Sequence, residues 1–213
     1  GERKRVRWGK GDIAEEGVLI TPTRIVRAGR FDEQAVRRLL AAEPWPARNV
    51  QQNLADLHAQ LAANSRGIRE LERAAATHGW PALLAYMGHV QDNAEACMRR
   101  AIRRLRDGRF HYEMDNGQVI AVSVCVDTGA GTATVDFTGT SPQQANNFNA
   151  PEPVTRAAVL YVFRVMVDDD IPMNAGCLRP INIVIPPQSM LTPEYPAAVV
   201  AGNVETSQAV TNC

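Results

Sequence analysis

An apolar stripe in the first half of the chain constrains the fold more than any other feature. Its members recur in steps of three and four residues, the spacing that keeps one face of a helix turned toward a partner. They are Leu54, Leu57, Leu61, Asn64, Ile68, Leu71 and Ala75. The stripe predicts a long helix that ends at Gly79, because glycine tolerates the left-handed conformation found after a helix end. Asn64, its one polar member, is expected to be buried and to fix the register of packing.

A second helical stripe follows Pro81, whose missing amide hydrogen costs nothing at a helix start. Its members are again three and four residues apart: Leu83, Met87, Val90, Ala94, Met98, Ile102 and Leu105. Two helices of roughly 25 residues joined by a tight turn predict an antiparallel helical hairpin about 38 Å long.

The hydrophobic pattern changes after Gly108 to strict alternation, which indicates β-strands. Alternating residues at 110–114, 119–126 and 132–138 are separated by turn sequences. They predict an antiparallel meander, followed by a packed helix over about residues 153–166 and a strand at 181–185. The predicted fold class is therefore α+β, with a long antiparallel helical hairpin, an antiparallel β-meander with a packed helix, and a loop-rich C-terminal part.

These patterns divide the chain into three segments. Residues 1–48 are predicted to hold short strands and one helix, with Asp32 as its N-cap because a carboxylate accepts the free amide hydrogens of a first turn. Residues 49–108 form the helical hairpin, and residues 109–213 form a β-rich segment with polar loops. We expect the three segments to make one integrated domain.

The charge of the chain points to no highly charged partner. Lysine and arginine together number 23, and so do aspartate and glutamate. This balance predicts no nucleic acid and no membrane surface as a partner. The N-terminus has no apolar run after its basic residues, and no run reaches the roughly 18 apolar residues of a membrane span. We therefore expect a cytoplasmic protein.

The residues that commonly bind metal ions are poorly spaced for that purpose. No two of His58, His78 and His89 are four residues apart, as a helical zinc site requires. The cysteines are scattered, with no C-x-x-C pair. Residues 168–170 are all aspartate and are interpreted as a solvated helix end, because adjacent carboxylates repel one another without a cation. No metal ion is expected in this chain.

A strand that leads into a long polar loop is the best candidate for a binding site. After Gly139 the chain is rich in amides, hydroxyls, glycine and proline as far as Pro153. Amides and hydroxyls donate and accept hydrogen bonds, so such a loop can hold an uncharged polar group such as a lactam or an imide. Phe148 offers an apolar anchor. A simple surface connection is the alternative interpretation.

Several motifs, in order along the chain, resemble those of the hydantoinase B/oxoprolinase family. They are E-E-G-V-L-I-T-P (residues 15–22), R-N-V-Q-Q-N-L-A-D-L-H-A-Q-L-A-A-N (48–64), V-D-F-T-G-T-S-P-Q (135–143), D-I-P-M-N-A-G-C-L-R-P-I (170–181) and G-N-V-E-T-S-Q (202–208). Members of this family are typically much longer, with a His/Asp-rich metal-binding region before the first motif. The chain is therefore expected to be the central segment of a longer subunit.

The resemblance implies a component of an ATP-dependent hydrolase that opens a cyclic amide, such as 5-oxoproline, a hydantoin or a related lactam. A hydantoinase A-type subunit or domain would bind ATP and Mg²⁺ and phosphorylate the substrate, and this component would complete the hydrolysis. The divalent metal is expected in the preceding region, and the assembly is expected to be an oligomer. The sequence contains no phosphate-binding G-x-x-x-x-G-K-[ST] loop, in agreement with ATP binding elsewhere. Related assemblies carboxylate small ketones, and a non-catalytic scaffold that only docks a partner is a further alternative.

Two lone acids are the catalytic candidates. Asp136 or Glu205 could assist a water molecule as a general base. An Asp136 that caps a turn is an equally good interpretation. Asp115 is a further isolated acid in the same polar loops.

The substrate-binding candidates are hydroxyl, amide and guanidinium groups of the loops: Thr140, Asn149, Asn174, Arg179 and Asn203. Amides would orient the substrate, and Arg179 would pair with a carboxylate or a phosphate. The loops at residues 138–149 and 174–179 are predicted to border one polar cleft. The isolated segment is expected to lack hydrolase activity.

Overall fold

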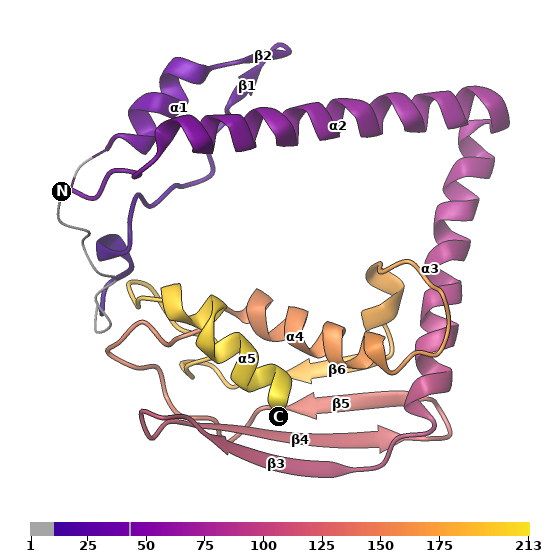
Figure 1. Ribbon diagram of the computed structural model, residues 1–213. Helices are drawn as coiled ribbons and strands as arrows, with labels where there is room; N and C mark the ends of the chain where they lie inside the picture. Colours follow the sequence, from indigo (N-terminus) through magenta and orange to yellow (C-terminus); the bar gives the residue numbers. More distant parts are fainter. Residues whose placement is uncertain (1–10, 43) are drawn as a thin grey trace. The chain divides into compact units, whose positions relative to one another are not determined.

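The computed structural model describes residues 11–42 and 44–213, shown as a ribbon in Figure 1. Residues 1–10, part of the first predicted segment, lie outside the described residues. The chain forms two compact units, one of residues 13–85 and one of residues 86–213 together with Gly11 and Asp12. The boundary falls inside a helix, and the α+β class predicted from the sequence is confirmed. The predicted packing of the two long helical stripes on each other is not supported, because Leu71 of the first stripe and Met87 and Val90 of the second are exposed.

The first unit is mainly helical. Its elements are η1 (Ile13–Glu15), β1 (Val26–Arg27), β2 (Arg30–Phe31), α1 (Glu33–Leu40), α2 (Val50–His78) and the first residues of α3 (Trp80–Ile102). Asp32 is the N-cap of α1, as predicted, and its Oδ1 accepts a hydrogen bond from the amide of Ala35 at 3.0 Å. Val36 and Leu40 of α1 are buried with Leu54 of α2 and form the small core of this unit.

The helix α2 has the predicted length, but its apolar stripe is buried only near its ends. Gly79 follows the helix with φ of 81°, which confirms the predicted break. Leu54 and Ala75 are buried, whereas Ile68 is 58% exposed and Leu71 is 43% exposed. The prediction that Asn64 is buried is wrong, because it lies on the exposed middle of the stripe. Leu54 is covered because α1 packs against that end of the helix.

The second unit is built on a four-stranded sheet. Besides the rest of α3, its elements are β3 (Gly108–Glu113), β4 (Val119–Asp127), β5 (Thr132–Asp136), α4 (Glu152–Val165), η2 (Ala175–Leu178), β6 (Ile181–Val184), η3 (Val200–Asn203) and α5 (Glu205–Asn212). The strand order is β3-β4-β5-β6. The first three strands form the predicted antiparallel meander, and β6 runs parallel to β5. The connection between β5 and β6 contains α4, which gives a parallel pair the crossover it needs.

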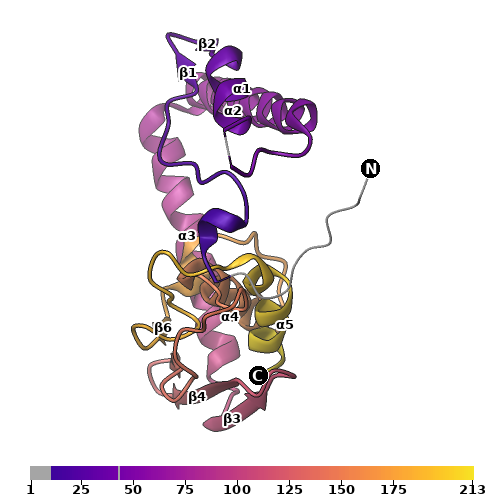
Figure 2. The same cartoon turned by 90° about the vertical axis from the view of Figure 1, so that its left-hand side faces the viewer.

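One face of this sheet is covered by α4 and α5, as Figures 1 and 2 show. Ile120 and Val122 of β4 belong to the buried core together with Met98 of α3, Phe163 of α4 and Val210 of α5. The side chain of Cys125 in the same strand points to the opposite face of the sheet and is exposed. This alternation is the pattern that predicted the strands, because successive side chains of a strand point to opposite faces. Within residues 11–42 and 44–213, no helix is both long and apolar enough to cross a membrane.

Candidate functional site

The polar loop after β5 is held in shape by Asn149, which is fully buried. Its Oδ1 accepts a hydrogen bond from the amide of Gln144 at 2.8 Å. Its Nδ2 lies within hydrogen-bond distance of the carbonyl oxygens of Gln144, Asn146 and Ala198, at 3.0, 2.8 and 3.0 Å. The amide of Asn149 is therefore committed to the backbone of the protein, which favours a role in positioning the loop over the substrate-binding role predicted for it.

Gly202 and Thr206 hold the segment formed by η3 and α5 against the same loop. A β-carbon at Gly202 would overlap the carbonyl oxygen of Asn149, so only glycine permits this approach. The hydroxyl of Thr206 donates a hydrogen bond to the carbonyl oxygen of Phe148 at 2.5 Å. The motif G-N-V-E-T-S-Q thus contains the two residues that fix η3 and the start of α5 against the backbone of residues 148–150.

A cavity of about 290 Å³ lies where this loop, α5 and the β3–β4 turn meet in the second unit. Its lining combines carboxylates, amides and apolar groups. The residues are Tyr112, Met114, Asp115, Asn116, Phe148, Glu205, Gln208, Ala209 and Asn212. The volume is close to the lower end of the range for small-molecule pockets, roughly 300 to 1,000 Å³. We take this cavity as the candidate site and call it the Glu205 pocket.

The chemistry of the Glu205 pocket suits a small, polar, uncharged ligand. Asn116, Gln208 and Asn212 carry amides that can donate and accept hydrogen bonds, and Phe148 supplies an apolar surface. The carboxylates of Glu205 and Asp115 have no hydrogen-bond or ion-pair partner within the described part of the chain. A carboxylate in this condition can accept a proton from a water molecule beside a bound ligand.

The other predicted catalytic residue lies outside this pocket. The carboxylate of Asp136, at the end of β5, accepts a hydrogen bond from the amide of Thr138 at 2.8 Å. This is the turn-capping geometry that the sequence left open as an alternative. Thr140 is also occupied by the backbone: its buried hydroxyl accepts from the amide of Ala121 at 3.1 Å and donates to the carbonyl oxygen of the same residue at 3.2 Å. These two side chains join the loop to the sheet.

The second predicted loop packs against α3. The Oδ1 of Asn174 accepts a hydrogen bond from the amide of Gly176 at 2.8 Å and caps η2. A β-carbon at Gly176 would overlap the carbonyl oxygen of Gln91 on α3, so the loop approaches that helix as closely as a glycine allows. The loop at residues 174–179 contributes no side chain to the Glu205 pocket, whereas the first loop contributes Phe148.

Arg179 pairs with side chains of α3. It donates to Asp92 at 2.8 Å and to Gln91 at 2.7 Å, and it lies 3.3 Å from Glu95. The hydrogen bond to Asp92, with that to Glu95, raises the pKa of Arg179 above its ordinary value. The hydrogen bonds from Arg99 hold the pKa of the Glu95 carboxyl below its usual range. The guanidinium predicted to bind substrate is therefore part of an ion-pair network within the protein.

Asn203, the last predicted residue, is exposed and does not line the pocket. Several lining residues were missed by the sequence reasoning, namely Tyr112, Met114, Asn116, Gln208, Ala209 and Asn212. Four of the lining residues, at positions 205, 208, 209 and 212, follow the spacing of one helix face. That spacing was a usable signal for α5. The approach of the β3–β4 turn depends on tertiary packing and had no signal in the local sequence.

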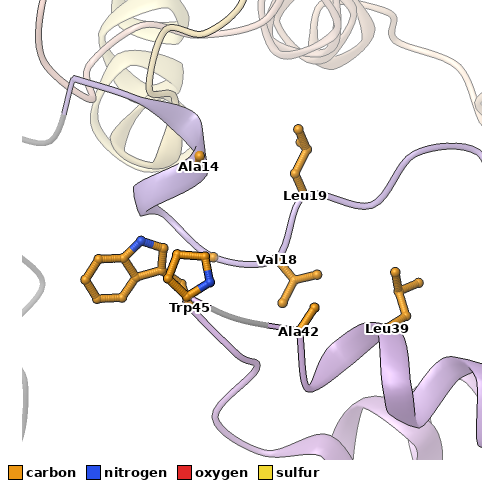
Figure 3. A pocket seen from close by; sticks show the side chains of 8 residues that line it. Ala14, Val18, Leu19, Leu39, Ala42 and Trp45 are labelled. Atoms are coloured by element: carbon orange, nitrogen blue, oxygen red, sulfur yellow. The ribbon is translucent and has the colours of Figure 1, made fainter.

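A second cavity, of about 250 Å³, belongs to the first unit and is apolar (Figure 3). It is lined by Ala14, Gly17, Val18, Leu19, Leu39, Ala42, Pro44 and Trp45. The lining residues that the structure describes include no carboxylate, amide side chain or cation for chemistry, so we do not take it as the reactive site. Among the described residues, no group of three or more histidine, cysteine, aspartate or glutamate side chains is arranged to hold a metal ion.

Comparison with known protein families gives one extended match. The family model described as Hydantoinase B/oxoprolinase matches residues 6–213. The chain is 40% identical to 5-oxoprolinase 1 of Arabidopsis thaliana, over 94% of this chain and 18% of the relative. It is 36% identical to 5-oxoprolinase of Saccharomyces cerevisiae, over 94% of this chain and 17% of the relative. The chain therefore spans about a sixth of the length of these curated relatives.

Two solved structures share the fold. The chain resembles the ATP-dependent caprolactamase of Pseudomonas jessenii with a TM-score of 0.76 and 22% identity, over 96% of this chain and 36% of the other. It resembles an acetone carboxylase with a TM-score of 0.75 and 13% identity, over 92% of this chain and 28% of the other. At these identities the similarity establishes the fold.

Proposed function

Because the chain belongs to the hydantoinase B/oxoprolinase family, we propose that it forms part of an ATP-dependent hydrolase that opens a small cyclic amide, such as 5-oxoproline or a hydantoin. The observation that carries the proposal is the Glu205 pocket, in which a carboxylate without a partner among the described residues faces amides and an aromatic side chain. The identity to 5-oxoprolinases supports the class of substrate.

In this proposal the pocket residues have separate roles. The amides of Asn116 and Gln208 hydrogen-bond the ring amide, and Phe148 packs against the ring carbons. Glu205 accepts a proton from the water that attacks the phosphorylated carbon of the ring, and it passes this proton to the ring nitrogen as the ring C–N bond breaks. A second water then hydrolyses the resulting acyl phosphate and releases inorganic phosphate. Asn149, Thr140 and Gly202 act at a distance by fixing the loop and α5.

The partners follow from the family. A hydantoinase A-type subunit or domain binds ATP and Mg²⁺ and phosphorylates the substrate in this proposal. A relative from Pseudomonas sp. strain NS671, named as the B component of a putative D-/L-hydantoinase, is 29% identical over 68% of this chain and 28% of the relative. This likeness supports a component of the B type. The divalent metal implied by the family has no matching set of side chains among the described residues, so we route no step through a metal.

A comparison of substrates tests this proposal. The complete subunit that carries residues 1–213 is combined with an A-type partner and ATP, and phosphate release is measured with 5-oxoproline, with a hydantoin, and with acetone plus bicarbonate. We expect phosphate release coupled to ring opening with a cyclic amide. Phosphate release with acetone and bicarbonate alone would favour the ketone carboxylase alternative. Failure with all three substrates, in an intact assembly, would favour the scaffold alternative.

A further inference from the structure

The strand β3 forms an outer edge of the four-stranded sheet and is exposed on both faces. The order β3-β4-β5-β6 leaves β3 with one neighbour. Every residue of the strand is exposed except Tyr112, which is half-buried, and Phe110 is 48% exposed. An edge of this kind presents free N–H and C=O groups, which form a template for a further strand.

The register shows which residues face the free edge. The amide of Met114, next after the strand, donates to the carbonyl oxygen of Gln118 at 2.8 Å. Backbone groups alternate between the two sides of an antiparallel strand, so even-numbered residues of β3 bond to β4. The N–H and C=O groups of Arg109, His111 and Glu113 therefore point away from β4. No partner for these groups exists in the part of the chain that the structure describes.

We propose that β3 pairs antiparallel with β3 of a second copy of the chain, about a two-fold axis at His111. Residues that face the free edge must oppose one another in such a pair. Arg109 then lies opposite Glu113 of the second copy, and the same ion pair recurs on the other side of the axis. Phe110 lies opposite Tyr112 of the second copy, and aromatic cross-strand pairs stabilise a sheet. The strand is thus complementary to itself in charge and in apolar surface.

The pattern of charges selects this register. Backbone alternation allows only shifts of two residues between the strands. One shift brings Asp107 opposite Glu113 of the second copy, which places like charges together. The other brings Arg109 opposite Asp115, which lies in the turn after the strand has ended at Glu113. Only the register centred on His111 keeps both opposite-charge pairs inside β3.

Analytical ultracentrifugation of charge variants tests the pairing. Arg109→Glu and Glu113→Arg should each raise the dimer Kd at least about tenfold, because each creates two like-charge cross-strand pairs. The double variant Arg109→Glu/Glu113→Arg restores both opposite-charge pairs and should return the Kd to within about threefold of the original. A mixture of the two single variants should form heterodimers. Arg106→Glu is the matched control, since Arg106 is exposed outside the strand, and it should leave the Kd unchanged.

A backbone variant tests the edge independently of charge. His111→Pro removes an N–H group that does not bond to β4, so circular dichroism should show an intact sheet while the dimer is lost. Hydrogen exchange at the His111 amide of the unchanged chain should slow as the protein concentration rises.

Three results would overturn the proposal. One is a chain that stays monomeric up to a concentration on the order of 1 mM, the weak limit of measurable affinity. Another is a dimer that tolerates His111→Pro. The third is a double charge variant as weak as the single ones.

Discussion

The substitution Gly202→Ala should test how α5 is held on the polar loop. A β-carbon at this position would overlap the carbonyl oxygen of Asn149 and lie 2.7 Å from the α-carbon of Ala150. That backbone has little freedom to move, because Asn149 is buried and hydrogen-bonded on all sides. Overpacking of a filled interior costs about 1 to 3 kcal/mol. If η3 shifts outward, the Thr206–Phe148 hydrogen bond is also lost, at about 0.5 to 1.5 kcal/mol. We expect the free energy of unfolding to fall by roughly 2 to 4 kcal/mol.

The assay should report on the second unit alone, since the chain has two compact units. Hydrogen exchange at the β4 amides, followed against urea concentration, gives the free energy of opening of the sheet. Gly108→Ala is the control, because Gly108 lies in the same unit and no atom lies within 4 Å of the position that its β-carbon would take. This change should shift stability by at most about 1 kcal/mol. If the β4 amides of the Gly202→Ala chain were protected from hydrogen exchange as well as those of the original chain, the close approach of Gly202 to Asn149 would be refuted.

Three further outcomes follow from the hydrogen bonds and the burial. Thr140→Val should lower the free energy of unfolding by about 1 to 3 kcal/mol, because it leaves the buried backbone groups of Ala121 unpaired. Thr138→Val, at an exposed position, is the control and should cost almost nothing. Equal losses for the two variants in urea denaturation would contradict the structural role of the Thr140 hydroxyl. Arg179→Ala should leave the urea midpoint of unfolding almost unchanged, since the ion pairs of Arg179 are exposed to solvent; a clear fall in the midpoint would show that the network with α3 is essential. Burial raises the pKa of the Cys213 thiol from 9.0 to about 11, so its rate of alkylation by iodoacetamide, measured by mass spectrometry, should keep rising toward pH 11 in the folded chain and level off near pH 9 in urea. The unfolded chain releases this proton first, so stability should fall as the pH rises above about 9; equal titration in both states would contradict the burial.

The elements of the second unit were predictable because their sequence pattern reports burial directly. Ile120 and Val122 of β4 lie in the core and Cys125 on the other face is exposed, as the alternation predicted. Ala121 is also buried, because Gly139 and Thr140 of the polar loop lie against it. The parallel pairing of β6 with β5 had no local signal, because it depends on a crossover through α4. The stripe of α2 illustrates the limit of periodicity. The spacing identified an apolar helix face but could not say what covers it, and Ile68 is exposed.

The candidate site was predictable in part. Glu205 was identified within the G-N-V-E-T-S-Q motif and Phe148 as the apolar anchor of the polar loop, and both line the pocket. Asp136 and Thr140 were chosen for the same polarity, but their side chains bond to nearby backbone groups. A sequence cannot show whether a polar side chain in a loop serves the backbone or a ligand, since the same donors and acceptors suit both. Asn116 was missed because its place beside α5 is set by packing between segments distant in sequence.

The most direct test of the proposed function is the turnover of a Glu205→Gln variant in the complete assembly with its A-type partner and a cyclic amide. The amide keeps the size of the side chain and cannot accept a proton, so kcat should fall by about 10² to 10⁴, the usual contribution of a general base. Thermal unfolding should be unchanged, since the Glu205 side chain is exposed and has no partner among the described residues. Glu72→Gln, at an exposed position on α2, is the matched control and should retain full turnover. A Glu205→Gln assembly with the kcat of the control would contradict the assignment of this pocket as the reactive site.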